Sequence, residues 1–121
     1  MKKTAIIGAT TNPSRYAYFA ADMLTAKGHE IVPLGIKKGE VSGVEIMDIR
    51  QKPEVKGVDT VTLYLGPQNQ APWYDYILSL KPERIIFNPG TENETFRVLA
   101  NQHGIDTEEA CTLVLLRLGA Y

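Results

Sequence analysis

The sequence predicts an α/β protein: a Rossmann-like, three-layer fold with a mostly parallel sheet in the order 3-2-1-4-5-6 and helices on both faces. Short β-branched apolar runs alternate along the chain with segments whose apolar residues recur at helical spacing. The first run ends at a glycine-containing turn that leads into a helical pattern, which is typical of a nucleotide-binding unit. Right-handed crossovers favour this strand order when the second half starts again beside the first strand.

Size and composition limit the classes of protein that fit. The 121 residues suffice for one hydrophobic core, so a single domain over residues 1–121 is expected. The formal net charge of −1 lacks the basic excess of a nucleic-acid-binding protein. No apolar run approaches the ~20 residues that span a bilayer. Cys111 is the only cysteine, which excludes an internal disulfide and a cysteine-based zinc site. We therefore expect a cytoplasmic protein that contacts neither nucleic acid nor membrane.

The first half of the chain begins with the elements that carry the glycine-containing turn. Three are expected: a strand at residues 4–8, a helix at 14–27 and a second strand at 30–34. Ser14 is the predicted N-cap of this helix and Gly28 its predicted C-cap. Pro33 has no N–H to donate to a ladder, so we expect it to mark the end of the second strand.

The rest of the chain reads as further strands and helices around an irregular loop at residues 35–43. A short edge strand at 44–46 and a polar connection at 48–56 come next. Five elements follow that connection and a fourth strand at 58–65: a helix at 69–80, a strand at 84–87, a helix at 92–103, a weak edge strand at 105–109 and a helix at 112–118. Thr91 is predicted as the N-cap of the helix at 92–103, and Glu94 as its capping-box partner.

The predicted topology brings polar segments to one crevice. Ligands of open α/β sheets bind outside the carboxyl ends of the strands, where the strand order reverses. Four segments are expected there: residues 8–15, 33–38, 64–67 and 88–91. The turn in the first of them aims free backbone N–H groups and the positive end of a helix dipole at one place, which favours a phosphate.

The turn fits neither of the common phosphate-binding motifs. A P-loop would need glycine followed by lysine where the chain has Pro13-Ser14, and the dinucleotide fingerprint would need glycine at Thr10 and Pro13. The second strand also ends without the acidic residue that grips an NAD ribose. The next charges are instead Lys37 and Lys38.

The groups at the turn suit a phosphorylated adenine nucleotide other than NAD. Thr10, Thr11 and Ser14 supply hydroxyl groups. Pro13 sets φ near the value needed to begin a helix, where its missing N–H costs nothing. Arg15 and the two lysines can screen a phosphate.

Three motifs stand in a recognisable order: Gly8-Ala9-Thr10, then Asn12-Pro13-Ser14-Arg15-Tyr16, then Gly28 with Val32-Pro33. In these motifs the chain resembles the CoA-binding domain family, which is similar to the N-terminal domain of the succinyl-CoA synthetase α subunit. The resemblance implies a small stand-alone domain that binds coenzyme A, with the diphosphate over residues 8–14 and the adenine near residues 33–37. The chain departs from the family at Leu34-Gly35-Ile36, where Val-Asn-Pro is frequent, and at Leu65-Gly66-Pro67, where an arginine is frequent.

The residues predicted to contact coenzyme A lie in three parts of the crevice. They are Gly8, Ala9, Thr10, Thr11, Asn12, Pro13, Ser14 and Arg15 in the turn, Pro33, Leu34, Lys37 and Lys38 after the second strand, and Tyr64 and Asn88 beside the later strands. Tyr64 fits core packing as well as ligand contact. Asn88 fits either a structural turn or a place beside the thiol end of the ligand. No catalytic residue and no metal-ligand set is predicted.

Three functions remain open from the sequence. The first is binding of coenzyme A or acyl-CoA without catalysis by this chain; in the synthetase, the resemblance implies catalysis by a phosphohistidine in a separate domain. The second is a small enzyme, either an NAD(P)-dependent oxidoreductase or an acyl-CoA-handling transferase. Cys111 fits a nucleophile or a disulfide partner for a CoA thiol, but a lone cysteine before an apolar helix is more often a buried small hydrophobe. The third is a CoA-sensing regulatory module with a protein partner, which could dock on the apolar helix at 112–118.

Overall fold

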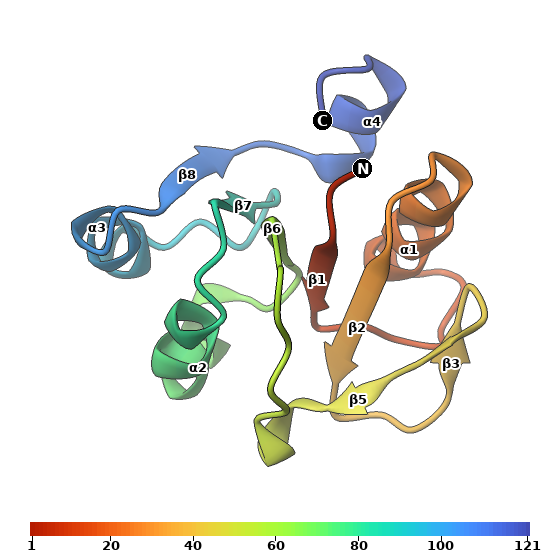
Figure 1. The fold of residues 1–121 in the computed structure, drawn as a ribbon, viewed down its shortest axis with the longest axis horizontal. Coiled ribbons are helices and arrows are strands. Elements are labelled where there is room, and N and C mark those ends of the chain that lie inside the picture. The colour runs from red at the N-terminus through yellow and green to blue at the C-terminus, as the bar shows by residue number, and fades with distance from the viewer.

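The computed structural model describes residues 1–121 as a sheet between two layers of helices (Figure 1). The six-stranded sheet has the order β5-β2-β1-β6-β7-β8, and every pairing in it is parallel. This confirms the predicted fold class and strand order. The strands are β1 (Thr4–Ile7), β2 (Ile31–Gly35), β5 (Met47–Asp48), β6 (Thr60–Leu63), β7 (Arg84–Phe87) and β8 (Asp106–Glu109).

The helices cover both faces of the sheet. Figure 1 shows α1 (Tyr16–Ala26) and α4 (Thr112–Arg117) on one side and α2 (Tyr74–Ser79) and α3 (Glu94–Gln102) on the other. Alternation along β1 produces two cores, because successive side chains of a strand point to opposite faces. Ala5 and Ile7 join the cluster that includes α2 and α3, whereas Ile6 joins the cluster that includes α1 and α4. The longest helix has 11 residues, and none has the length and apolar character needed to cross a membrane.

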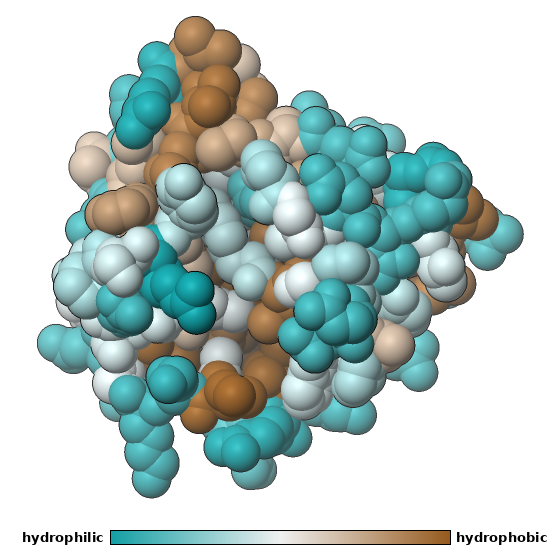
Figure 2. All heavy atoms as spheres, turned by 180° about the vertical axis from the view of Figure 1, so that it is seen from behind, coloured by the Kyte–Doolittle hydropathy of each residue, from teal (hydrophilic) through white to brown (hydrophobic).

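Figure 2 shows apolar side chains gathered over α4 on the face seen from behind. Leu113 and Leu116 are the large apolar residues of this helix that are buried. Val114 and Leu118 remain exposed, Leu118 to 74%. The predicted terminal helix therefore contributes to the core with one side and leaves the other side uncovered.

The segment between β2 and β6 contains more structure than predicted. β3 (Glu40–Val41) and β4 (Val44–Glu45) form a separate antiparallel hairpin. The third strand of the main sheet is β5, not the edge strand predicted at residues 44–46, and a 3₁₀ turn (Ile49–Gln51) follows it. Because β5 is only two residues long, its sequence carries no alternation that could reveal a strand.

β2 continues through Pro33 to Gly35, so the prediction that Pro33 ends the strand was wrong. The carbonyl groups of Glu30 and Leu34 accept hydrogen bonds from β1 and its turn. Alternate residues of a strand bond to the same side, so the nitrogen of Pro33 points away from β1. On that other side, β5 begins only opposite Leu34. The missing N–H of Pro33 therefore leaves no ladder partner unpaired.

The start of α1 also differs from the prediction. Arg15 is its N-cap residue, and no side chain caps the helix. Ser14, the predicted N-cap, instead donates both its N–H and its hydroxyl to Oδ1 of Asn12. At the other end, Lys27 is the C-cap, and Gly28 follows it with a φ of +85°. The helix therefore ends one residue earlier than predicted, and Gly28 follows the C-cap in the left-handed region that glycine adopts without strain.

Asn93 caps α3, so the predicted cap at Thr91 was wrong. Oδ1 of Asn93 accepts the N–H of Phe96 at 3.1 Å. The hydroxyl of Thr91 donates to the carbonyl group of Asn88 within the preceding turn. Glu94 forms an ion pair with an arginine one turn along the helix and closes no capping box.

The aromatic packing beneath α3 makes a first prediction. Phe96 is fully buried, stacks on Tyr74 at a centroid distance of 4.4 Å and meets Phe87 edge-on at 5.9 Å. We expect Phe96→Ala to lower the free energy of unfolding by about 3–5 kcal/mol, because it leaves a cavity in the core. Denaturant unfolding measures this loss. Val98→Ala on the exposed side of the same helix is the control, with an expected change within about 0.5 kcal/mol. Equal losses in the two variants would contradict the assigned core.

Candidate phosphate-binding site

The turn after β1 lies between the carboxyl ends of β2 and β6. Gly8 has a φ of +96°, and a Cβ atom there would lie 3.1 Å from the carbonyl oxygen of Tyr64. Both constraints favour glycine at this position. The N–H groups of Gly8 and Ala9 both donate to the carbonyl oxygen of Leu34 at 3.0 Å. The turn is thereby anchored at the point where the strand order reverses.

Beyond this anchor, the turn presents unused backbone donors. The N–H groups of Asn12 and Ser14 bond within the turn, to the hydroxyl of Thr10 and to Oδ1 of Asn12. Four other N–H groups have no partner in the protein: those of Thr10, Thr11, Tyr16 and Ala17. They lie in the turn and at the positive end of α1, an arrangement that suits a phosphate.

The end of β2 and the loop after it pack closely on this turn. A Cβ atom on Gly35 would lie 2.6 Å from the carbonyl oxygen of Ala9, and one on Gly39 would lie 2.7 Å from Cγ2 of Thr11. Lys37 and Lys38 are both exposed. Lys38 lines a cavity of about 690 Å³ together with residues of the β3–β4 hairpin, β5 and the 3₁₀ turn. The structure thus brings one of the two predicted lysines to a cavity at the hairpin and β5, and none of residues 8–15 lines that cavity.

The same cavity contains a carboxylate that the sequence analysis missed. Asp48 ends β5 and is the register partner of Gly35 at the end of β2. Arg50 donates Nε and Nη2 to its two carboxylate oxygens at 2.9 and 3.0 Å. These hydrogen bonds from Arg50 lower the pKa of Asp48, so the carboxylate is ionised at neutral pH. The Asp-x-Arg spacing at the start of a helical turn could have indicated the pairing of Asp48 with Arg50. Only the fold shows that Asp48 lies beside Gly35.

Pro33 and Leu34 are buried, so their side chains do not line the crevice. Leu34 is fully buried in the core beneath α2 and α3. Its part in the site is the carbonyl group that anchors the turn. Arg15 lies exposed at the end of the turn, where its guanidinium is available to an anion.

Tyr64 follows β6, and its hydroxyl group is buried without a hydrogen-bond partner. Burial raises its pKa to about 12, so this phenol stays neutral at physiological pH. The hydroxyls of Thr62 and Thr112 lie close enough to oppose the shift but outside hydrogen-bond geometry. Contact between the ring of Tyr64 and a ligand stays a prediction.

Asn88 is only 3% exposed and joins three elements. Its Nδ2 donates to Oγ1 of Thr62 at 2.7 Å and to the carbonyl group of Leu63 at 2.8 Å. Its Oδ1 accepts the N–H of Thr112 at 2.9 Å. These bonds tie the ends of β6 and β7 to the start of α4, which is a structural role. Its predicted place beside the thiol end of a ligand stays a prediction.

A second buried amide, Gln70, was missed from the sequence. It is fully buried and connects the loop after β6 with the loop after β7. Gln70 stands near the start of the helix predicted at residues 69–80, in a polar run between two prolines. No local pattern could indicate its burial, because its partners lie in a different loop.

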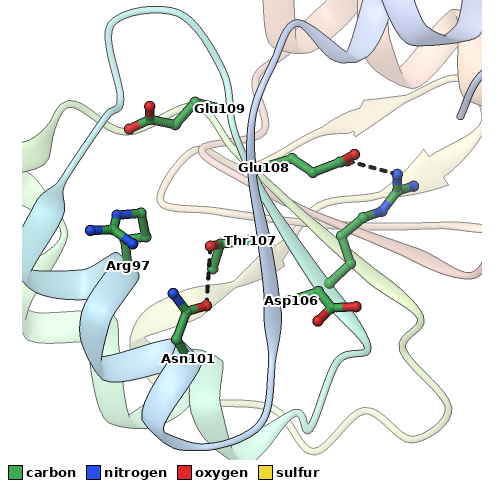
Figure 3. Close-up of a pocket in the computed structure, with 7 residues that line it drawn as sticks. Arg97, Asn101, Asp106, Thr107, Glu108 and Glu109 are labelled. Atoms are coloured by element: carbon green, nitrogen blue, oxygen red, sulfur yellow. Dashed lines mark hydrogen bonds and ion pairs between the residues drawn. The ribbon is translucent and has the colours of Figure 1, made fainter.

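The cavity drawn in Figure 3 lies along β8, the strand at the opposite edge of the sheet from β5. It measures about 650 Å³ and is lined by seven residues of β7, α3 and β8, none of them hydrophobic. Glu108 pairs with Arg84 at 3.0 Å, and the hydroxyl of Thr107 donates to Asn101 at 3.2 Å. None of these residues belongs to the turn or to the loop after β2, so this cavity is separate from the candidate site.

A parallel sheet that reverses its order beside a phosphate-type turn defines a Rossmann-like protein of the nucleotide-binding class. The chain belongs to the CoA binding domain family, whose profile matches residues 2–117. This confirms the family resemblance seen in the motifs of the turn and the second strand.

Solved structures share this fold over nearly the whole chain. An uncharacterized protein is 55% identical, with a TM-score of 0.96 over 100% of this chain and 98% of that one. A Thermus thermophilus protein is 20% identical, with a TM-score of 0.82 over 99% of this chain and 90% of that one. A dinucleotide-forming acetyl-coenzyme A synthetase 1 from Ca. Korarchaeum cryptofilum, in complex with phosphate and ADP, is 16% identical, with a TM-score of 0.71 over 90% and 25%. A comparison with curated proteins gave no match.

The close approach of Gly35 to the turn makes a second prediction. We expect Gly35→Ala to lower the free energy of unfolding by about 1–3 kcal/mol, because its methyl group would press on the backbone of Ala9. The backbone amide resonances of residues 8–11 should also shift. Gly57→Ala is the control: nothing lies within 4 Å of its added methyl group, although its φ of +75° brings its own strain. Unchanged turn resonances in Gly35→Ala would contradict the assigned contact.

Proposed function

We propose that this protein binds coenzyme A or an acyl-CoA, with the diphosphate over residues 8–14, and that the chain does not catalyse a reaction by itself. The observation that carries the proposal is the set of free N–H groups at Thr10, Thr11 and the first turn of α1. A diphosphate would satisfy these donors and complement the helix dipole. Membership of the CoA binding domain family supports this choice of ligand.

The proposed adenosine end of the site is the loop after β2. Coenzyme A carries a further phosphate on its ribose, and this loop offers Lys37 and Lys38. Neither lysine takes part in an ion pair within the protein. Asp48, the carboxylate nearest the end of β2 by register, is already bound by Arg50. Glu40 and Glu45 of the hairpin line the same cavity and are also unpaired, so the positive charge is confined to the loop itself. There, Lys37 and Lys38 favour a ligand with an additional phosphate.

The proposal assigns no catalytic residue. Cys111 is the N-cap residue of α4 and is half-buried. The proposal gives its thiol a structural role. Tyr64 stays protonated at neutral pH and supplies no base. A cytosolic location belongs to the same proposal, since a chain with one cysteine gains no disulfide from an oxidising compartment.

A ligand series tests the class of nucleotide. A ligand that binds only the native state increases the free energy of unfolding, by about 2.7 kcal/mol at a hundredfold excess over Kd, and so raises the thermal midpoint. We expect coenzyme A and acetyl-CoA to raise the thermal midpoint more than ATP, NAD or NADP at equal concentration. A rise with NAD and none with coenzyme A would overturn the proposal in favour of a nicotinamide nucleotide.

A charge change in the turn tests the place of the diphosphate. Ser14→Glu puts a carboxylate beside the free donors, so we expect the Kd of coenzyme A to rise on the order of tenfold or more through repulsion. Ser14→Gln, an uncharged variant of the same size, is the matched control and should weaken binding much less. Isothermal titration calorimetry measures both. Equal affinities for the two variants would place the diphosphate elsewhere.

A further inference from the structure

We propose that Gln70 is a positioning residue of the crevice: it locks the loops after β6 and β7 into one wall, and the turn after β1 rests on that wall. The inference rests on the proposed function, because the wall matters to binding only if the ligand lies in this crevice. It concerns a residue that contacts no ligand itself, since Gln70 is fully buried.

Every polar atom of the Gln70 side chain is used. Nε2 donates to the carbonyl group of Leu65 at 2.9 Å and to that of Thr91 at 2.8 Å. Oε1 accepts Nδ2 of Asn93 at 3.0 Å. An amide has two N–H donors, so both are used here. Since a buried amide without partners is costly, these bonds fix the distance between the two loops.

The bonds continue into the helices on the same face of the sheet. Nδ2 of Asn93 also donates to the hydroxyl of Tyr74 at 2.8 Å, and Tyr74 begins α2. Oδ1 of Asn93 caps α3 through the N–H of Phe96. One connected set of hydrogen bonds therefore runs from Leu65 through Gln70 and Asn93 to α2 and α3. The wall cannot shift without breaking bonds that hold both helices.

The phosphate-type turn lies directly against the segment that Gln70 holds. A Cβ atom on Gly8 would lie 3.1 Å from the carbonyl oxygen of Tyr64 and 3.3 Å from Cδ2 of Leu65. The N–H of Tyr64 donates to the carbonyl group of Ile7 at the end of β1. If Leu65 moves, the surface beneath Gly8 moves with it. A site held rigid before binding loses less entropy when the ligand arrives, so looseness here costs affinity.

An apolar residue at position 70 could fill the space but could not hold the loops. The carbonyl groups of Leu65 and Thr91 have no hydrogen-bond donor other than Gln70. Gln70→Met keeps a similar volume and removes both donors and the acceptor. We expect this variant to raise the Kd of coenzyme A on the order of tenfold, as the loss of pre-organisation requires. Hydrogen exchange should become faster in residues 64–70 and 88–93.

The control separates positioning from loss of stability. Leu80 is also buried, at 6% exposure, in the core on the same face, but it precedes β7 and so lies toward the amino ends of the strands. Leu80→Ala should lower the thermal midpoint and leave the Kd of coenzyme A within about twofold when measured well below that midpoint. Hydrogen exchange of Leu80→Ala in residues 64–70 and 88–93 should match that of the wild-type protein.

A milder variant keeps the test decisive if Gln70→Met does not fold. Asn93→Ser retains an oxygen that can cap α3 and removes the amide that donates to Gln70 and Tyr74. We expect a smaller loss of affinity, about threefold. Wild-type protein that binds no coenzyme A would defeat the proposed function itself. Wild-type binding together with unchanged affinity in Gln70→Met, or in Asn93→Ser where the first variant does not fold, would overturn only the role of Gln70.

Discussion

The carbonyl oxygen of Leu34 accepts the N–H groups of both Gly8 and Ala9, and the conformation of the site depends on this shared acceptor. The bonds stop β1 from continuing and turn the chain toward α1. Gly35 lies so close to Ala9 that a side chain would not fit between them. With the turn fixed at its base, the N–H groups of the next residues remain unpaired, and unpaired donors at a helix start are what an anion binds.

The two sides of the crevice are built differently. On the β6–β7 side, the buried amides of Asn88 and Gln70 hold the strand ends and loops, one toward α4 and the other toward α2 and α3. Buried polar networks of this kind are costly to rearrange, so they specify one arrangement of the backbone. On the β2 side, the wall is a loop with exposed residues from 36 to 40. The two sides of the crevice therefore differ: one is a wall fixed by buried amides, and the other is a solvent-facing loop with two lysines and Glu40.

The features that could be predicted from the sequence are the ones encoded locally. The run Thr4–Ile7, the apolar spacing of α1 and the glycine turn between them suffice for a βα unit, and alternation of such units gave the strand order. The features that could not be predicted depend on neighbours distant in sequence. Pro33 is tolerated because β5 begins only opposite Leu34. Ser14 is no cap because α1 begins at Tyr16, with Arg15 in the cap position, while Ser14 bonds to Asn12 within the turn. Gln70 has only the pattern of a polar residue in the helix predicted at 69–80, and its burial depends on the loop after β7 that packs against it.

The charges at the end of β2 show how fold and ligand preference are connected. Lacking an acid directly after β2, the chain reads as unsuited to an NAD ribose, yet the fold returns Asp48 to that strand end. Its carboxylate accepts three hydrogen bonds from Arg50, one from the backbone and two from the guanidinium. A ribose hydroxyl would have to displace a charged, bidentate partner to reach it, and such bonds are roughly twice as strong as neutral ones. An anion faces no such competition at Lys37 and Lys38. Under the proposed function, the end of β2 would therefore favour a phosphate because its acid is already paired, and not because an acid is absent.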